Sequence, residues 1–311
     1  MNIIFMGTPD FAIPVLERLH KHHGIPAVFT APSKRTGRSQ VMTNSPVQQW
    51  AQSYDIPVYT PKSLRLPDVQ ELIESIEPDL VVVAAYGLFI PDTILTLPRL
   101  GCWNIHPSLL PKLRGPSPVV TSILQRDIVT GVSIMKLDQN MDSGPILAQH
   151  SYHMSFSETA SSLTRSLFEI GADLLHDCIA RADRDNLVET IAQNDAEATF
   201  TSKQRKEDGL INWDSTSQDI EAQIRAYTPW PGSFTYWNGK ILKILSANLP
   251  TADSDRQFPT GTVTKGPGGT LNILTGNSQI EVSMVQLEGK KAMKPEEFLL
   301  GYPSIIGAKL G

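Results

Sequence analysis

The chain has 311 residues, of which 41% are hydrophobic, with a net charge of −5 and two cysteines, Cys102 and Cys178. This length can form one large and one smaller domain. Two cysteines argue against a disulfide scaffold or a four-ligand zinc site, and the negative charge argues against general polyanion binding. Apolar runs stop short of the roughly 20 residues of a membrane span. The N-terminus enters a strand at once rather than a signal peptide, so we expect a cytoplasmic protein with no membrane partner.

The first half alternates short β-branched runs with stretches of helical periodicity, which is typical of βαβ units on a parallel sheet. The continuous apolar run at residues 80–85 indicates a sheet covered on both faces, whose ligands bind beyond the carboxyl ends of the strands. We therefore expect a Rossmann-like α/β domain over residues 1–189. Gly7 follows the first run without the other glycines of a dinucleotide-binding turn. Strands are expected at residues 2–6, 27–31, 80–86, 102–106 and 131–137, and helices at residues 10–22, 45–54, 67–75, 117–125 and 158–181.

The second part of the chain has a different pattern. Residues 190–205 show no sustained period and are expected to be a linker. Residues 206–311 contain short apolar runs separated by Gly and Asn, including the hairpin signal Asn238-Gly239. This pattern predicts a small β-barrel, with an OB-like fold among the options.

A candidate site follows the run "CWNIH". Asn104 and His106 are two residues apart on the predicted strand, so they share a face, and Pro107 ends the strand. About 6.6 Å of strand separates them, so one carbonyl atom could lie about 3 Å from both side chains. Taken alone, such a pair is more often a core histidine beside a turn asparagine. Cys102 lies roughly 13 Å along the strand from His106, which is too far for a nucleophile and its base, and is expected in the core.

A carboxylate is the third member of this candidate site. Asp142 lies in a loop after the strand at residues 131–137, just before Ser143-Gly144-Pro145, where the chain must turn sharply. If the two strands are neighbours, we expect this loop to lie at the same edge of the sheet as His106. An isolated loop aspartate is usually solvated, so the interest of Asp142 depends on Asn104 and His106.

Five segments together carry a resemblance over almost the whole chain, namely "MGTPDFA", "NIHPSLLPKLRGPSP", "GVSIMKLDQNMDSGPIL", "AYTPWPGS" and "GKKAM". They resemble the folate-dependent formyltransferase family, and the last two resemble its tRNA-acting branch. The resemblance implies transfer of a formyl group from 10-formyltetrahydrofolate to the amino group of methionyl initiator tRNA, without a metal. It implies a formyltransferase catalytic domain followed by an OB-like tRNA-binding domain, and we expect a monomer.

The resemblance also implies roles for individual residues. Asn104 and a protonated His106 would donate hydrogen bonds to the oxyanion that develops on the formyl group. Asp142 would favour the imidazolium and accept a proton from the amine. The folate is expected to pack against a stiff apolar wall, whose backbone groups could bind a pterin-like ring. The residues assigned to the folate are Ser108, Leu109, Leu110, Pro111, Tyr86 and Gly87.

Contacts with tRNA phosphates are expected from two basic clusters, one in the early loop "APSKRTGRSQ" and one in "GKKAMK". The family usually has an aspartate where Ser33 stands. The basic residues assigned to tRNA are Lys34, Arg35, Arg38, Lys290 and Lys291.

Other functions share the same candidate site. A folate formyltransferase acting on a small amine, or a hydrolase that passes the formyl group to water, would also use Asn104, His106 and Asp142, but would not need residues 206–311 in this form. A non-catalytic RNA-binding protein built on the same two domains is the alternative from another class. Discharge of the folate in the presence of charged initiator tRNA would distinguish these alternatives.

Overall fold

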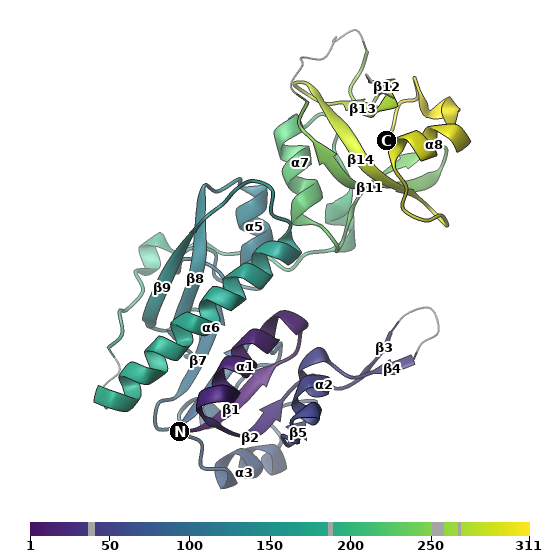
Figure 1. Ribbon diagram of the computed structural model, residues 1–311. Coiled ribbons are helices and arrows are strands. Elements are labelled where there is room, and N and C mark those ends of the chain that lie inside the picture. The colour runs from purple at the N-terminus through teal and green to yellow at the C-terminus, as the bar shows by residue number, and fades with distance from the viewer. Residues whose placement is uncertain (37–40, 186–188, 251–257, 267–268) are drawn as a thin grey trace. The chain divides into compact units, whose positions relative to one another are not determined.

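The computed structural model describes residues 1–36, 41–185, 189–250, 258–266 and 269–311 (Figure 1). The chain forms two compact units. Unit 1 consists of Met1–Pro118, Val129–His153 and Thr164–Thr201, and unit 2 of Val119–Ile128, Met154–Leu163 and Ser202–Gly311. The domain limits at residues 189 and 206 stay a prediction.

Unit 1 contains a seven-stranded sheet in the order β5-β2-β1-β6-β7-β8-β9. The first five of these strands are parallel, which confirms the expected α/β sheet, and β8 and β9 extend it in antiparallel pairing. The strands are β1 (Asn2–Gly7), β2 (Gly24–Phe29), β5 (Val58–Tyr59), β6 (Leu80–Ala84), β7 (Cys102–His106), β8 (Val129–Lys136) and β9 (Ile146–His153).

The direction of β8 changes the expected route to the candidate site. His106 lies opposite Ser133, and Trp103 lies opposite Lys136, so β8 ends beside the start of β7. The loop that carries Asp142 therefore leaves the sheet at the edge opposite to His106. The expectation that both segments leave at one edge is wrong, and the loop must instead fold back over a face of the sheet.

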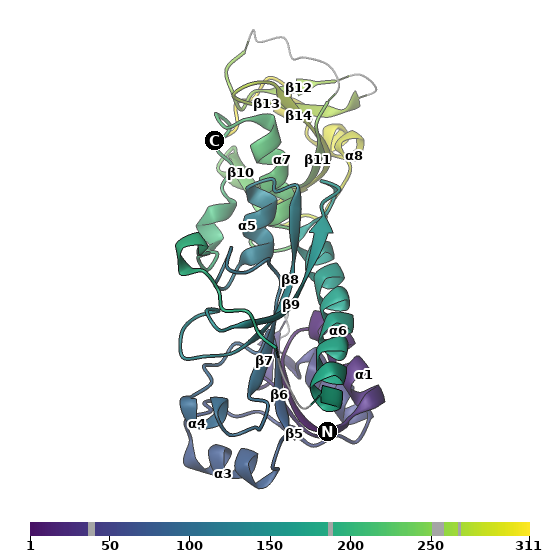
Figure 2. The ribbon, with the colours of Figure 1, turned by 90° about the vertical axis from the view of Figure 1, so that its left-hand side faces the viewer.

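Helices cover both faces of this sheet, with α1 and α6 on one side and α3 and α4 on the other (Figure 2). Gly171 of α6 packs closely against Ile105, so the face that Ile105 points to is the α6 face. Because strand residues alternate between faces, Cys102, Asn104 and His106 point to the α3 and α4 face. The helices of unit 1 are α1 (Ile13–His22), α2 (Pro46–Ser53), α3 (Pro67–Ser75), α4 (Asp92–Leu95) and most of α6 (Ala160–Asp185). Helix α5 (Pro118–Leu124) belongs almost entirely to unit 2.

A short hairpin leaves unit 1 before α2. Its strands are β3 (Lys34–Thr36) and β4 (Val41–Thr43), which pair antiparallel. At its base the Ser33 hydroxyl donates to Asn44 Oδ1 over 2.7 Å. The Ser45 hydroxyl accepts from Gln48 N–H and so caps α2. The hairpin is thus fastened where it joins the sheet domain.

Unit 2 contains a five-stranded antiparallel sheet in the order β10-β11-β14-β13-β12. Asn238 and Gly239 connect β10 to β11 with positive φ values of 49° and 74°, as a two-residue hairpin turn requires. The predicted hairpin is therefore confirmed. The elements are α7 (Ser217–Ala226), β10 (Ser233–Trp237), β11 (Lys240–Asn248), β12 (Val263–Lys265), β13 (Leu271–Leu274), β14 (Gln279–Leu287) and α8 (Pro295–Gly301).

The C-terminal tail links the two edge strands of this sheet. Gly311 N–H donates to the Tyr236 carbonyl on β10, and Val263 N–H on β12 donates to the Ala308 carbonyl. These contacts satisfy backbone groups that an open sheet edge would leave unpaired. The antiparallel sheet with its bridging tail agrees with the β-rich second domain expected from the sequence.

Candidate active site

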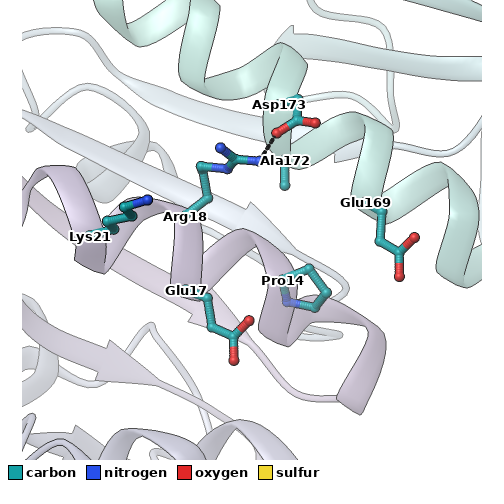
Figure 3. A pocket seen from close by; sticks show the side chains of 7 residues that line it. All are labelled: Pro14, Glu17, Arg18, Lys21, Glu169, Ala172 and Asp173. Carbon is teal, nitrogen blue, oxygen red and sulfur yellow. Dashed lines mark hydrogen bonds and ion pairs between the residues drawn. The ribbon is translucent and has the colours of Figure 1, made fainter.

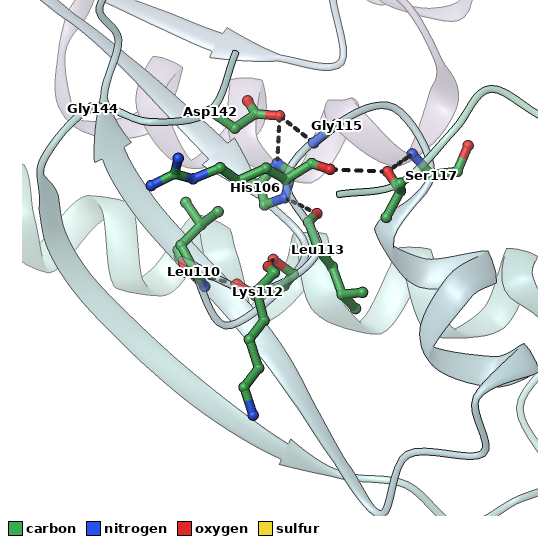
Figure 4. Close-up of polar contacts among 12 residues, drawn as sticks. His106, Leu110, Lys112, Leu113, Gly115, Ser117, Asp142 and Gly144 are labelled. Carbon is green, nitrogen blue, oxygen red and sulfur yellow. Dashed lines mark hydrogen bonds and ion pairs between the residues drawn. The ribbon is translucent and has the colours of Figure 1, made fainter. Parts of the chain in front are cut away.

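His106 ends β7 and is almost completely buried, with 4% of its surface exposed. Its Nε2 lies 3.0 Å from the Leu113 carbonyl (Figure 4). Because a carbonyl only accepts, Nε2 carries the proton and donates. The other ring nitrogen, Nδ1, lies 3.6 Å from Asp142 Oδ2. The ring is therefore fixed in one orientation between a loop carbonyl and a carboxylate.

Asp142 reaches this ring from the loop between β8 and β9. Its Oδ2 accepts a hydrogen bond from Gly115 N–H over 2.8 Å. The residue has a φ of 51°, in the left-handed region that aspartate tolerates better than most residues. A Cβ on Gly144 would lie 1.9 Å from the Lys136 carbonyl oxygen, so the sharp turn after Asp142 requires glycine there. The structure thus brings Asp142 to His106, as predicted, by a different path.

Burial and charge act on the His106 ring in opposite directions. Burial lowers the pKa of His106, because a buried imidazolium loses its hydration. The Asp142 carboxylate and the hydrogen bond to Leu113 both oppose this shift, but they do not outweigh it. The resting ring is therefore favoured in its neutral form, in contrast to the protonated His106 expected from the sequence. Neutral Nδ1 is left as a proton acceptor beside a carboxylate.

Asn104 lies on the same face of β7 as His106 and is partly exposed. Its carboxamide makes no hydrogen bond to the part of the chain that the structure describes. A partly exposed amide without a protein partner can donate an N–H to a ligand. Asn104 is therefore free for the role of oxyanion donor.

The segment assigned to the folate is held mainly by hydrogen bonds to β8 and β9. Ser133 Oγ donates to the Ser108 carbonyl over 2.6 Å and accepts from Leu110 N–H, while Gln149 Nε2 donates to the Leu110 carbonyl. Lys112 N–H donates to the Leu109 carbonyl. Backbone groups that were expected to bind a pterin-like ring are thus already bonded within the protein.

Side chains of this segment divide between core and surface. Leu110 packs against Met135 and Ile146 in the core, and Ser108 is fully buried, with its hydroxyl donating to the Lys112 carbonyl. Leu109 and Pro111 are partly exposed. Only these two side chains can therefore contribute to an apolar wall for a ligand.

Tyr86 and Gly87 follow β6 at the carboxyl edge of the sheet. Tyr86 is buried, its hydroxyl has no hydrogen-bond partner among the described residues, and burial raises the pKa of this phenol. Gly87 has a φ of 87°, and a Cβ there would meet nothing within 4 Å. The backbone groups of Gly87 form no hydrogen bond with the described ranges, so this short segment has polar groups available to a ligand.

The basic residues are exposed on two loops. Lys34 and Arg35 lie on the β3–β4 hairpin, and Arg38 lies outside the described residues. Lys290 and Lys291 follow β14 in a turn, where Lys290 N–H donates to Leu287 O. All four described residues are accessible to a large partner.

The buried thiol of Cys102 does not support nucleophilic chemistry. Burial raises the pKa of Cys102 to about 12, so its thiol is not a nucleophile at neutral pH. Within the described ranges, no three His, Cys, Asp or Glu side chains cluster closely enough to hold a metal ion. No helix in the described part of the chain has the length and apolar character needed to cross a bilayer.

A separate groove of about 380 Å³ lies between α1 and α6 (Figure 3). Arg18 and Asp173 form an ion pair across it. Its lining is mostly charged and includes none of the residues assigned to catalysis or folate. The lining residues are Pro14, Glu17, Arg18, Lys21, Glu169, Ala172 and Asp173.

Comparison with known families decides the identity of this site. Residues 1–179 match the family model described as formyl transferase, and residues 203–303 match that of the formyl transferase C-terminal domain. The chain belongs to the formyl transferase family. A curated methionyl-tRNA formyltransferase from Rickettsia massiliae is 40% identical over 301 residues, covering 97% of each chain.

Two solved structures show that the fold of this formyl transferase is shared with distant proteins. Methionyl-tRNA formyltransferase from Clostridium thermocellum matches with a TM-score of 0.57 at 19% identity, over 81% of this chain and 95% of that chain. HypX from Aquifex aeolicus, in complex with tetrahydrofolic acid, matches with a TM-score of 0.62 at 16% identity, over 97% of this chain. The formyl transferase spans about half of the HypX chain, 47% of its length.

Several residues that shape the site have no clear signal in the sequence. Ser133 and Gln149 hold the 108–110 segment from β8 and β9. Within the segment 190–205 that was predicted to be a linker, residues up to 201 hydrogen-bond to the site loops; for example, Leu113 N–H donates to Thr199 Oγ1. An isolated polar residue in a strand gives a weak signal for Ser133, and no periodicity marks residues 190–201.

Proposed function

We propose that this formyl transferase moves the formyl group of 10-formyltetrahydrofolate to the amino group of methionyl initiator tRNA. The observation that carries the proposal is the 3.6 Å approach of Asp142 to a buried His106, with the unbonded amide of Asn104 on the same face of β7. The name and extent of the Rickettsia relative support the tRNA substrate, because it matches both units of the chain.

The reaction requires an oxyanion donor and a route for one proton. The amine attacks the formyl carbon, its proton departs, and the bond from that carbon to the folate nitrogen breaks as this nitrogen gains a proton. Asn104 donates its N–H to the carbonyl oxygen as negative charge develops there. Such a donor is typically worth about 10² to 10³ in rate.

His106 and Asp142 act on the proton. Neutral Nδ1 of His106 takes the amine proton, and the Asp142 carboxylate and the Leu113 carbonyl stabilise the imidazolium that results. The imidazolium then returns the proton to the leaving nitrogen. Because Nδ1 and Oδ2 are 3.6 Å apart, which is longer than a direct hydrogen bond, the reacting group or a water can interact with both.

The folate is held between two parts of unit 1. Leu109 and Pro111 supply apolar contact, while the backbone groups of Gly87, which form no hydrogen bond with the described residues, supply hydrogen bonds. The tetrahydrofolic acid bound to HypX supports a folate ligand for this fold. Lys34, Arg35, Lys290 and Lys291 contact tRNA phosphates.

One assay tests this proposal against its alternatives. The chain is mixed with 10-formyltetrahydrofolate and methionyl initiator tRNA, and formylmethionyl-tRNA and free tetrahydrofolate are both measured. We expect equal amounts of the two products, and little folate discharge without tRNA or with an amino sugar nucleotide. Discharge to water or to the sugar at a comparable rate would contradict the tRNA substrate, and tRNA binding without transfer would show a non-catalytic RNA-binding protein.

A further inference from the structure

Two separate loops meet at the His106 ring. One supplies the Leu113 carbonyl to Nε2, and the other supplies the Asp142 carboxylate beside Nδ1. Among the described residues, the hydrogen bond from Gly115 N–H to Asp142 Oδ2 joins these loops directly at the ring. The relative position of ring and carboxylate therefore depends on what fastens the two loops to each other.

Gln193 makes this connection from outside the ring. Its Nε2 donates to the Asp142 carbonyl over 2.9 Å and to the Gly144 carbonyl over 2.7 Å. Its Oε1 accepts from Arg114 Nε over 3.0 Å. The Gln193 carboxamide thus donates to the loop that carries Asp142 and accepts from Arg114, the residue that follows Leu113.

Arg114 makes the second end of this bridge rigid. Arg114 is only 4% exposed, so its guanidinium group needs hydrogen-bond partners within the protein. Besides Gln193 it donates from Nη2 to Asp195 over 2.7 Å. The backbone of Arg114 is paired with residues 199 and 201, because Arg114 N–H donates to Thr199 O and Thr201 N–H donates to Arg114 O.

The Asp142 loop needs such an external support. Asp142 is in the left-handed region, and Gly144 is pressed against the Lys136 carbonyl. Conformations of this kind persist when the surrounding structure over-determines them. Of the described residues, only Gln193 hydrogen-bonds the carbonyls of both Asp142 and Gly144.

We propose that Gln193 is a positioning residue for formyl transfer, which sets the separation between the Asp142 carboxylate and His106 Nδ1 by tying the 142–144 turn to Arg114. It does not touch the reacting atoms. A misplacement of about 1 Å can cost about 100-fold in rate, so loss of this bridge should reduce kcat and leave both KM values nearly unchanged. The kinetic part of the test rests on the proposed function.

Two substitutions separate the ends of the bridge. Gln193→Met is neutral and similar in size, and it removes all three hydrogen bonds. Gln193→Glu keeps an acceptor for Arg114 but loses both donors to the Asp142 loop. Gln70→Met is the matched control, because Gln70 Nε2 also donates to a backbone carbonyl, that of Leu64, in the same unit. Folding of each variant is checked by its thermal midpoint.

The expected result is that both Gln193 variants lose about 10- to 100-fold in kcat, while Gln70→Met retains the wild-type kcat. A Gln193→Glu variant with wild-type kcat would overturn the proposal, because the donors to the Asp142 loop would then be dispensable. The proposal would also be overturned if the loss of kcat in each Gln193 variant were fully explained by a smaller fraction of folded protein.

A second readout needs no turnover. The pKa of the His106 ring is measured by NMR titration in the wild type and in Gln193→Met. Because Asp142 raises this pKa, a carboxylate released from its position should let the pKa fall further. An unchanged His106 pKa in a folded Gln193→Met variant would overturn the positioning role. Absence of formylation in the wild type would instead contradict the proposed function, and the NMR measurement of the His106 pKa would still test the positioning role of Gln193.

Discussion

The loop after β7 and the β3–β4 hairpin both belong to unit 1 and both carry predicted functional residues, but they are held very differently. Residues 107–117 are fastened by Ser133 and Gln149 on one side and by Thr199 on the other. The hairpin is fastened at its base through Ser33, and its described side chains, at residues 34, 35 and 41–43, are exposed. Proton transfer needs fixed distances within one site, whereas phosphate contacts act through charge at the surface.

The largest effect is expected from removing the oxyanion donor. Asn104→Ala should lower kcat by about 10² to 10³, with little change in KM, because the amide would act mainly on charge that develops during the reaction. Steady-state formylation kinetics measure this. A folded Asn104→Ala variant with near wild-type kcat would contradict the role of this residue.

The hydrogen bonds that fasten the loop at residues 107–117 can be removed by a substitution at Ser133. Ser133→Ala leaves Leu110 N–H and the Ser108 carbonyl without their buried hydrogen-bond partner, which typically costs about 1–3 kcal/mol of stability. We expect a lower free energy of unfolding in a denaturant titration and a reduced kcat in the folded protein. Ser157→Ala, in an exposed turn, is the control and should change neither.

The pH dependence should follow the His106 ring. Burial lowers the pKa of His106, and the neutral ring is the proton acceptor, so kcat should be constant near neutral pH and fall as pH drops through a value below about 6.5. In Asp142→Asn this acidic limb should move to lower pH, since the carboxylate raises the ring pKa. A shift of the acidic limb to higher pH in Asp142→Asn would contradict the role of the carboxylate in raising the pKa of His106.

The smallest effect is expected at the hairpin. Arg35→Ala should weaken tRNA binding and reduce the slope of log affinity against log salt by about 1, with kcat unchanged. Lys21→Ala, which removes a basic side chain from α1, should leave the slope as it is. Equal slopes for Arg35→Ala and wild type would remove Arg35 from the tRNA contacts.

Sequence patterns predicted the parts of the fold that depend on local order. The β-branched runs gave β1, β6 and β7 close to their observed bounds, and Asn238-Gly239 gave the β10–β11 turn. Strand alternation placed Asn104 and His106 on one face. The direction of β8 was not predictable, because apolar alternation is the same for parallel and antiparallel pairing.

The residues that hold the site loops in place could not be predicted from the sequence, for a physical reason. Gln193 contacts Gly144 and Asp142, which precede it in the sequence by 49 and 51 positions. Thr199 contacts Leu113, which precedes it by 86 positions. Polar residues in a segment without periodicity give no sign of such partners. The protonation of His106 also depends on burial by distant residues, which explains why the sequence favoured the charged form and the structure favours the neutral one.

The account depends on His106 and Asp142 acting as one unit on a single proton, which a double-mutant cycle tests directly. The measurement is kcat for formyl transfer in His106→Ala, Asp142→Asn and the double variant. Groups that act together are strongly non-additive, so the double variant should be no slower than the slower single variant. A double variant whose loss is the product of the two single losses would show independent roles and contradict the account.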